Sequence, residues 1–356
     1  MQETETIKAK KTRKRKVNWV IGVDVSKCTL DYAIMHHDKF LFHYRGKNDK
    51  EEILKFIIRL KEDSKIQMAS VVFCMEATGR YGQHLLFAIK KLKGRIAVVN
   101  PLIIKNFLGI IRGKNDKTDA IRIAQYAQKN LNDLVFWTPQ RIPLLELKHL
   151  FALRERMLTT VVALSTPLKE QKDFIPPSQH KQILKLCAKS IEAIHADLMN
   201  IDALIDQIIK TDELINRLMT LIVSVPGVGR ITALLILICT NEFKDISCPK
   251  KFACYAGVAP FKRESGQAVR KSRVSNFANK KMKSLLHLCA LSAVRFDSEM
   301  KAYLERKTTQ DGKPKLIVIN AVRCKLIGRV FACVHQDRMF EKNYLNKKEI
   351  TAAELD

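Results

Sequence analysis

The chain has 356 residues, of which 63 are Lys or Arg and 36 are Asp or Glu, so that its formal net charge is +27 at pH 7. This length allows about two or three domains with cores of their own. The positive charge favours a polyanionic partner, either nucleic acid or an anionic membrane surface. The longest apolar stretch, 231–239, is far shorter than the ~20 residues of a membrane-spanning helix, which excludes an integral membrane protein.

The cysteines and the chain ends indicate the cellular setting. Nine cysteines occur without a C-x-x-C pair, which argues against structural zinc and indicates reduced thiols in a cytosolic protein. The first 16 residues hold seven Lys or Arg and two Glu without an apolar period. We therefore expect a disordered basic tail at 1–16, serving as solvated charge or as an arm for nucleic acid, and no signal peptide. A second tail is expected at 341–356, and the protein is expected in the cytoplasm, associated with the nucleoid.

The first domain is expected at 17–140. Hydrophobic patterning predicts strands at 17–25, 31–36, 39–44, 69–76 and 95–99, and helices at 49–64, 81–93, 102–112 and 116–130. Three strands followed by alternating helices and strands is the element order of the ribonuclease-H-like α/β fold, in which the first strand is central. Fold analogy alone is weak support for a function.

Four acidic residues lie where such a fold would gather them. Asp24 and Glu76 end two apolar strands, and Asp116 and Asp119 open a helix with a spacing of three residues. Carboxylates at strand ends and on one helix face can converge on one point and hold Mg²⁺ against a phosphodiester. The alternative is that these residues cap helices and end strands without binding metal.

A long helical region is expected at 141–222. Apolar residues repeat there with alternating steps of three and four, which is the heptad pattern of a coiled coil: Leu184, Cys187, Ile191, Ile194, Leu198, Ile201, Ile205 and Ile208. A looser stripe precedes this seam at 150–168, and Pro167 is expected to kink or end its helix. Pro176 and Pro177 separate the two helical arms, which either pack as a hairpin within one chain or assemble two or more protomers.

The segment 224–233, Ser-Val-Pro-Gly-Val-Gly-Arg-Ile-Thr-Ala, opens a third region, expected at 223–340 and mainly helical. Pro-Gly-x-Gly between apolar helices matches the helix–hairpin–helix pattern, whose backbone N–H groups hold a phosphate. We therefore predict nucleic-acid contacts at Gly227, Gly229 and Arg230. The alternative is an ordinary tight turn between two helices.

A basic loop with a Ser-Gly pair follows. Eight Lys or Arg and one acid, Glu264, lie between positions 262 and 283; the predicted nucleic-acid contacts are Lys262, Arg263, Arg270, Lys271, Arg273, Lys280, Lys281 and Lys283. Ser265 lies within this charge and before a glycine that permits close backbone approach. Its hydroxyl is either a contact to phosphate or, if a base or metal activates it, a nucleophile. No histidine lies nearby in the sequence to serve as that base.

These motifs together resemble one family, the DEDD-type insertion-sequence transposases, which include bridge-RNA-guided recombinases and are related to pilin-gene invertases. The motifs that carry the resemblance are Gly-Val-Asp-Val-Ser-Lys (22–27), Met-Glu-Ala-Thr-Gly (75–79), Val-Asn-Pro (99–101), Lys-Asn-Asp-Lys-Thr-Asp-Ala (114–120), Val-Pro-Gly-Val-Gly (225–229), Tyr-Ala-Gly-Val-Ala-Pro (255–260) and Glu-Ser-Gly (264–266). The chain departs from the family where a Gly-Asn and a later Arg are usual, because it has Ala278-Asn279 and then Lys283. That difference affects nucleic-acid contacts rather than the chemistry.

The resemblance implies a RuvC-like domain, a coiled-coil insertion and a transposase domain with a catalytic serine. It places the metal carboxylates on Asp24, Glu76, Asp116 and Asp119, with Mg²⁺ as the ion and Mn²⁺ as a substitute, and the nucleophile on Ser265. It also implies donor and target double-stranded DNA, a structured guide RNA that pairs with both, and a homo-oligomer, a dimer or a tetramer, in which the two domains form a composite site. Such an enzyme would excise and insert its own element through a serine–DNA intermediate that conserves bond energy.

Three other functions remain open at this point. A RuvC-like structure-specific endonuclease would use water as the nucleophile, and a site-specific invertase would act without guide RNA. A nucleic-acid-binding scaffold would need no carboxylate chemistry.

Overall fold

A computed structural model describes residues 17–63, 66–77, 79–108, 115–265 and 268–342. The side chains of 63, 108 and 262–271 lie outside the description, and so do the tails expected at 1–16 and, from 343 onward, at 341–356. The chain divides into two compact units, Met1–Pro139 and Gln140–Asp356.

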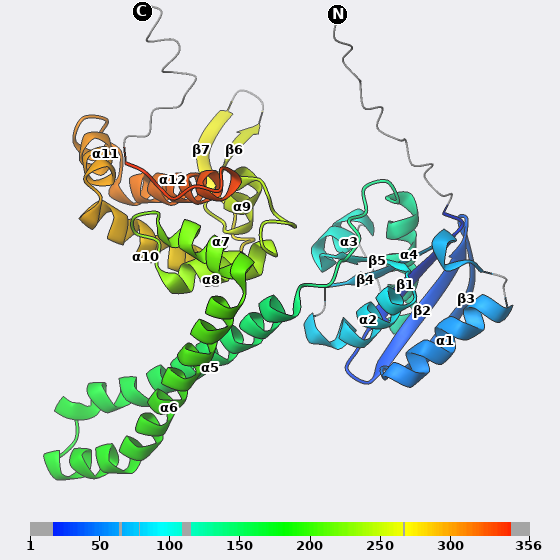
Figure 1. The fold of residues 1–356 in the computed structure, drawn as a ribbon, viewed down its shortest axis with the longest axis horizontal. Helices are drawn as coiled ribbons and strands as arrows, with labels where there is room; N and C mark the ends of the chain where they lie inside the picture. The colour runs from blue at the N-terminus through cyan, green and yellow to red at the C-terminus, as the bar shows by residue number, and fades with distance from the viewer. Residues whose placement is uncertain (1–16, 64–65, 78, 109–114, 266–267, 343–356) are drawn as a thin grey trace, which may run out of the picture. The chain divides into compact units, whose positions relative to one another are not determined.

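The first unit is a five-stranded sheet with helices on both faces (Figure 1). Its elements are β1 (Trp19–Val25), β2 (Thr29–His36), β3 (Lys39–Lys47), α1 (Lys50–Asp63), β4 (Val71–Glu76), α2 (Gln83–Lys91), β5 (Arg95–Val99), α3 (Pro101–Leu108) and α4 (Asp116–Lys129), with short 3₁₀ turns at Met68–Ser70 and Gly79–Gly82. The strand order is β3-β2-β1-β4-β5. β2 is antiparallel to β1 and β3, while β1, β4 and β5 are parallel. This arrangement confirms a mixed α/β fold with the first strand central, consistent with a ribonuclease-H-like domain.

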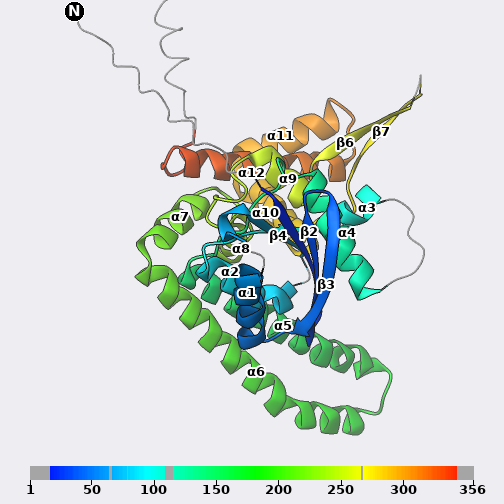
Figure 2. The ribbon, with the colours of Figure 1, turned by 90° about the vertical axis from the view of Figure 1, so that its right-hand side faces the viewer.

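Alternation along the central strands divides the core into two layers. Ile21, Val23, Phe73 and Met75 pack against α1 and α2. Val20 and Cys74 face the opposite way and pack against α4. Figure 2 shows α1 and α2 on one side of the sheet and α4 on the other. Because side chains alternate along a strand, Asp24 and Glu76 lie on the α4 face, as Val20 and Cys74 do.

The second unit is helical apart from one β-hairpin. Its elements are α5 (Ile142–Glu170), a 3₁₀ turn at Gln171–Asp173, α6 (Pro177–Thr211), α7 (Glu213–Val223), α8 (Arg230–Thr240), α9 (Pro249–Tyr255), β6 (Pro260–Ser265), β7 (Ala268–Val274), α10 (Lys280–Phe296), α11 (Ser298–Thr309) and α12 (Lys315–His335). The basic segment expected as a loop is therefore a two-stranded antiparallel hairpin with Ser265 opposite Ala268 near its tip. Within the described residues, no helix is long and apolar enough to cross a membrane.

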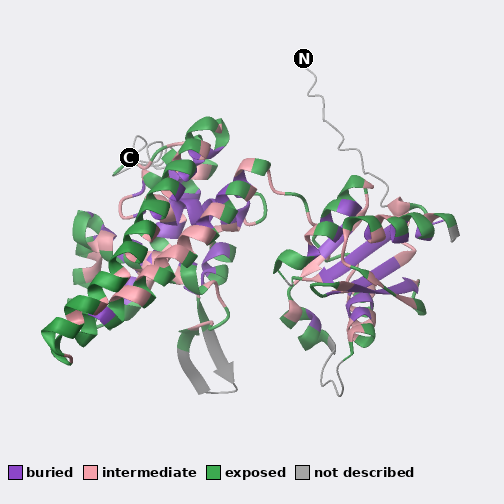
Figure 3. Ribbon diagram, turned by 90° about the horizontal axis from the view of Figure 1, so that it is seen from below, coloured by how far each residue is buried: buried purple, intermediate pink, exposed green. Residues whose placement is uncertain are grey.

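The helices α5 and α6 pack on each other as a hairpin that extends from the helical body. The seam is buried at Leu198, Ile201 and Ile205 and ends on Ile209, so that Ile208, the expected last position, is only partly buried. Farther from the body Leu184 is 40% exposed, and Figure 3 colours much of this distal part as exposed. The helix α5 also continues through Pro167 to Glu170 rather than ending at the proline. One chain thus buries only the half of the seam nearest the body.

Candidate active site

The candidate active site lies at one end of the sheet, where parallel strands β1 and β4 finish. Val23 pairs with Met75, so that Asp24 and Glu76, the next residues, occupy neighbouring positions in the parallel register. Asp24 is also paired with Asp31 of β2, and Asp31 with Arg45 of β3. A single row across the sheet therefore carries three carboxylates and a guanidinium on the face that α4 covers.

The helix α4 brings the other two acids to this row. Its N-cap is Asn115, whose side chain accepts a hydrogen bond from the backbone N–H of Lys117 at 3.1 Å. Because of this cap, the helix begins at Asp116. The helix packs closely because β1 has glycine at the crossing point. A Cβ on Gly22 would lie 2.3 Å from the carbonyl oxygen of Ala120 and 2.3 Å from the backbone nitrogen of Ala124.

Electrostatics show that these acids share one region. Asp24 is half-buried, and burial raises its pKa. The nearby charges of Asp119 and Asp116 raise this pKa further, as does Asp31, whereas a hydrogen bond from the backbone N–H of Val25 lowers it. On β4, burial raises the pKa of the Cys74 thiol, and the negative charge of Glu76 raises it further, to about 12. The carboxylates of Asp24, Asp116 and Asp119 are therefore near enough to interact electrostatically, while their joint binding of a metal stays a prediction.

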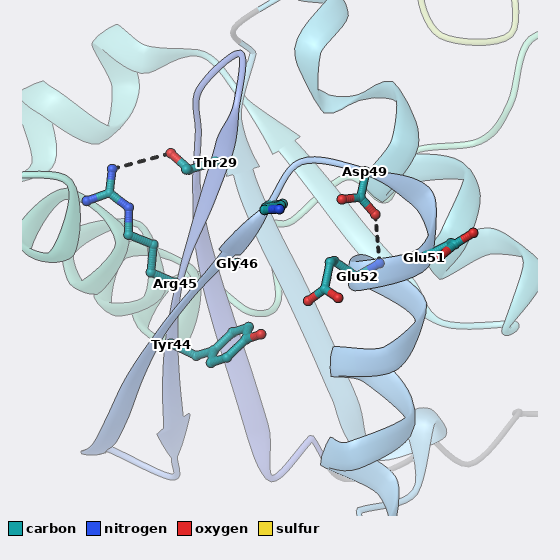
Figure 4. A pocket seen from close by; sticks show the side chains of 8 residues that line it. Thr29, Tyr44, Arg45, Gly46, Asp49, Glu51 and Glu52 are labelled. Atoms are coloured by element: carbon teal, nitrogen blue, oxygen red, sulfur yellow. Dashed lines mark hydrogen bonds between the residues drawn. The ribbon is translucent and has the colours of Figure 1, made fainter.

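Two arginines form ion pairs with three of the acids. The guanidinium of Arg122 lies 2.9 Å from Asp119, and that of Arg45 lies 3.3 Å from Asp116 and 3.6 Å from Asp31. Figure 4 shows Arg45 pointing toward Thr29, to which it donates a hydrogen bond of 3.4 Å, while Tyr44 points to the α1 side. Arg45 also borders an open pocket of about 590 Å³, lined by Thr29, Tyr44, Gly46, Lys47, Asp49 and Glu52 among others. This pocket lies at the same end of the sheet as the carboxylates.

Asp31 is a member of the cluster that the sequence analysis missed. Its side chain is buried, and it contacts His43 at 2.8 Å in addition to Arg45. Asp31 interrupts the apolar segment Leu-Asp-Tyr-Ala-Ile (30–34), and nothing in that segment indicates a function for the carboxylate. A buried aspartate followed 12 residues later by His43 is a weak sequence signal, because only the strand register makes the two partners.

The structure separates the predicted nucleic-acid contacts into groups. Arg230 binds Asp206 at 2.6 Å and the backbone carbonyl of Asp202 at 3.1 Å, and Lys281 forms an ion pair with Glu155. For Arg273, Lys280 and Lys283 the structure gives no ion pair within the described residues. The side chains of Ser265, Lys262, Arg263, Arg270 and Lys271 lie outside the described part, so their predicted roles stay predictions.

The predicted phosphate-binding turn joins α7 to α8. Gly227 has a φ of +89°, and a Cβ there would lie 2.8 Å from the Cβ of Ala293, so that this glycine is needed for packing on α10. Gly229 is exposed, with nothing within 4 Å of a Cβ, and it precedes the N-terminus of α8 without a side-chain cap. We therefore expect the phosphate contact of this turn at the N-terminus of α8 beside Gly229, where no side chain caps the helix, and assign Gly227 to packing.

Two family models match the chain. One, described as "Transposase" of the DEDD IS110 type, matches residues 21–176, and the other, described as "Transposase IS116/IS110/IS902 family", matches residues 219–305. Both describe the same transposase family. Two separate segments of the chain are therefore similar to IS110-type DEDD transposases.

Curated relatives point to the same kind of protein. The "Pilin gene-inverting protein" of Moraxella bovis is 26% identical over 333 residues, covering 90% of this chain and 97% of the relative. An uncharacterized 43.6 kDa protein of insertion element IS110 from Streptomyces coelicolor is 23% identical, covering 52% of this chain and 45% of the relative. An IS900 protein of Mycobacterium paratuberculosis is 24% identical, covering 49% and 43%. The family and these relatives support a DNA-cleaving and recombining enzyme that acts in transposition or inversion.

The four predicted site carboxylates, Asp24, Glu76, Asp116 and Asp119, have the oxygen donors that a hard divalent cation requires. All four are oxygen donors of the kind that Mg²⁺ binds; burial raises the pKa of Asp24 most, and the negative charges of Asp119 and Asp116 raise it further. Within the described residues, no group of three or more His, Cys, Asp or Glu is arranged to hold one ion. Asp116 and Asp119 would have to exchange their arginines for the metal, as the ion pairs with Arg45 and Arg122 indicate.

Proposed function

We propose that this transposase moves its insertion element through a covalent serine–DNA intermediate at Ser265. The observation that best supports catalysis is geometric: Asp24 and Glu76 are neighbours in the parallel register, and α4, which begins at Asp116, packs directly on β1 at Gly22. Asp24, Glu76, Asp116 and Asp119 would hold Mg²⁺, or Mn²⁺ in its place. The bound ion would polarise the scissile phosphate and lower the pKa of the attacking hydroxyl.

The serine step conserves the number of phosphodiester bonds. The Oγ of Ser265 attacks phosphorus and loses its proton, an ester bond to serine forms, and a phosphorus–oxygen bond of the strand breaks with release of a DNA hydroxyl. A hydroxyl of the partner strand then attacks the serine ester, so that the new strand forms and serine is regenerated. No ATP is needed, because bond energy is retained in the serine ester. Ser265 is the last residue of β6, at the tip of a basic hairpin, which suits access to a bulky strand.

Covalent trapping tests this proposal. With a cognate DNA substrate stopped during reaction, denaturing electrophoresis is expected to show a protease-sensitive protein–DNA adduct for the wild type. The adduct should vanish in Ser265→Ala and persist at a changed rate in Ser265→Cys. Ser272→Ala is the matched control, since Ser272 lies on the paired strand β7. Recombination by Ser265→Ala, or an adduct that maps to Ser272 or Ser275, contradicts the serine assignment.

The alternative functions predict different results for the same variants. An endonuclease that uses water needs the carboxylates but not Ser265, so it predicts full cleavage by Ser265→Ala. A binding scaffold predicts that Asp24→Ala leaves every activity intact.

Guidance by a structured RNA and assembly into a dimer or tetramer complete the proposal. The partly exposed distal seam of α6, with Leu184 at 40% exposure, supports contact with a second copy. Site-specific inversion without RNA is a second candidate, favoured by the long match to the pilin gene-inverting protein. Sequencing of RNA that co-purifies with the protein separates the two, because only the guided enzyme should retain one structured species.

A further inference from the structure

A partly exposed arginine on α12 has no carboxylate partner within the described residues. Arg323 donates from Nη2 to Nδ1 of His287 at 2.5 Å and from Nη1 to Oδ1 of Asn320 at 3.4 Å. Its Nε is buried without a hydrogen-bond partner. By contrast Arg329, on the same helix, lies 2.7 Å from Asp297 and 2.5 Å from Glu299. Arg323 is thus fixed in position while its charge is left unneutralised.

The histidine holds this guanidinium without sharing its charge. A guanidinium has only donors, so Nδ1 of His287 must accept and the ring must be neutral. Burial and the charge of Arg323 both lower the pKa of His287, which keeps the ring in that state. Burial also lowers the pKa of Arg323. An anion that reaches this group would relieve the cost of holding an unpaired charge there.

The site lies at the root of the β6–β7 hairpin. Asn320 donates from Nδ2 to the carbonyl of Val258 at 2.8 Å, and the thiol of Cys324 lies 3.5 Å from the same oxygen. Val258 comes two residues before β6 begins at Pro260. One helical turn before His287 on α10 is Lys283, which is partly exposed and has no described ion pair. These contacts hold α12, and with it Arg323, beside the residue that precedes the hairpin, and Lys283 follows on the neighbouring helix α10.

We propose that Arg323, oriented by His287 and assisted by Lys283, binds a phosphodiester group of the DNA backbone beside the hairpin. A fixed guanidinium makes short charge-assisted hydrogen bonds to phosphate oxygens, which position a strand without reading its sequence. The inference rests on the proposed action of this unit on DNA. It adds a binding site formed by α10 and α12 to the contacts that the hairpin and the turn at Gly229 offer.

The salt dependence of DNA binding tests this site. The affinity of the full chain for a duplex DNA probe is measured across a range of KCl concentrations, with Arg323→Gln, Arg323→Lys and, as matched control, Arg329→Gln. Each phosphate contact contributes about 0.9 to the slope of log affinity against log salt. Arg323→Gln should reduce the slope by about that amount, equally for unrelated sequences. Arg323→Lys should keep the slope but weaken binding, since a lysine cannot reproduce the fork.

The control distinguishes binding from structure. Arg329→Gln breaks an ion pair and should lower Tm while leaving the slope unchanged. His287→Ala keeps the charge of Arg323 but frees its orientation, so it should weaken affinity at an unchanged slope. An unchanged slope in Arg323→Gln overturns the site, and so does a slope change seen only with duplex RNA. If the wild type does not bind DNA at all, the proposed function fails; if it binds and cleaves while Arg323→Gln keeps the wild-type slope, only this inference fails.

Discussion

Gly22→Ala should disable cleavage by displacing α4 from the sheet. The new Cβ would lie 2.3 Å from the Ala120 carbonyl oxygen and from the Ala124 nitrogen, against at least 3.4 Å for ordinary contact, so the helix must move by about 1 Å. Both obstacles are backbone atoms of α4, which no side-chain rotation can remove. Asp116 and Asp119 move with the helix, away from Asp24. A displacement of this size costs about 10²-fold in rate when it separates catalytic groups, and overpacking costs about 1–3 kcal/mol of stability.

The assay compares single-turnover cleavage with thermal unfolding at a temperature where both variants stay folded. Gly328→Ala is the control for the exchange itself, because a Cβ there meets nothing within 4 Å in α12. That substitution should raise stability by about 0.5–1 kcal/mol and leave the rate unchanged. If Gly22→Ala keeps the wild-type rate and Tm, then the close packing of α4 on β1 is not what positions Asp116 and Asp119 beside Asp24.

The remaining predictions concern charge, backbone and assembly. Asp24→Asn and Glu76→Gln should abolish cleavage but spare DNA binding, and normal cleavage by both would end the metal-site assignment. Because burial, Asp119 and Asp116 raise the pKa of Asp24, its stabilising contribution is present at low pH and is lost as pH rises through that raised value. Asp24→Asn should therefore raise the Tm of the metal-free protein near neutral pH, a gain that shrinks at acidic pH, and should remove stabilisation by Mg²⁺. Gly227→Val should lower Tm, since its Cβ would lie 2.8 Å from Ala293, whereas Gly229→Val should keep Tm and weaken binding to all DNA sequences alike; unchanged affinity would leave an ordinary turn. Replacing Leu184 and Ile194 with Asp should break the oligomer in sedimentation without unfolding the chain, while Ile201→Asp, at a position 6% exposed, should also destabilise the hairpin.

The strands and helices of the first unit could be predicted from the sequence, because the patterns that indicate them lie within short segments. The two apolar runs that end in Asp24 and Glu76 form the parallel neighbouring strands β1 and β4. Asn115 is the N-cap of the helix that contains Asp116 and Asp119. The order of the elements was enough to place the first strand in the centre of the sheet.

Features that depend on partners distant in sequence could not be predicted. Arg230 is bound by Asp206 and Lys281 by Glu155, which are residues of α6 and α5 brought close by the fold of the helical unit. The dense charge of 260–274 masks the two-residue period of its strands, so the sequence predicts a loop where the structure has a hairpin. The heptad pattern continues along α6 to Leu184, but packing within one chain buries only its second half.

The charges around Asp24 support the proposed cation site more than a set of purely structural ion pairs. Asp116 and Asp119 are balanced by Arg45 and Arg122, and Asp31 shares Arg45 with Asp116. Asp24 has no described ion pair, although it stands in the centre of the row and its pKa is raised by the acids around it. A purely structural cluster would be most stable with that charge neutralised, because repulsion among carboxylates opposes folding. The fold instead keeps this negative charge at the end of the central strand, beside Glu76, where a bound divalent cation would remove the repulsion and also attract a phosphodiester.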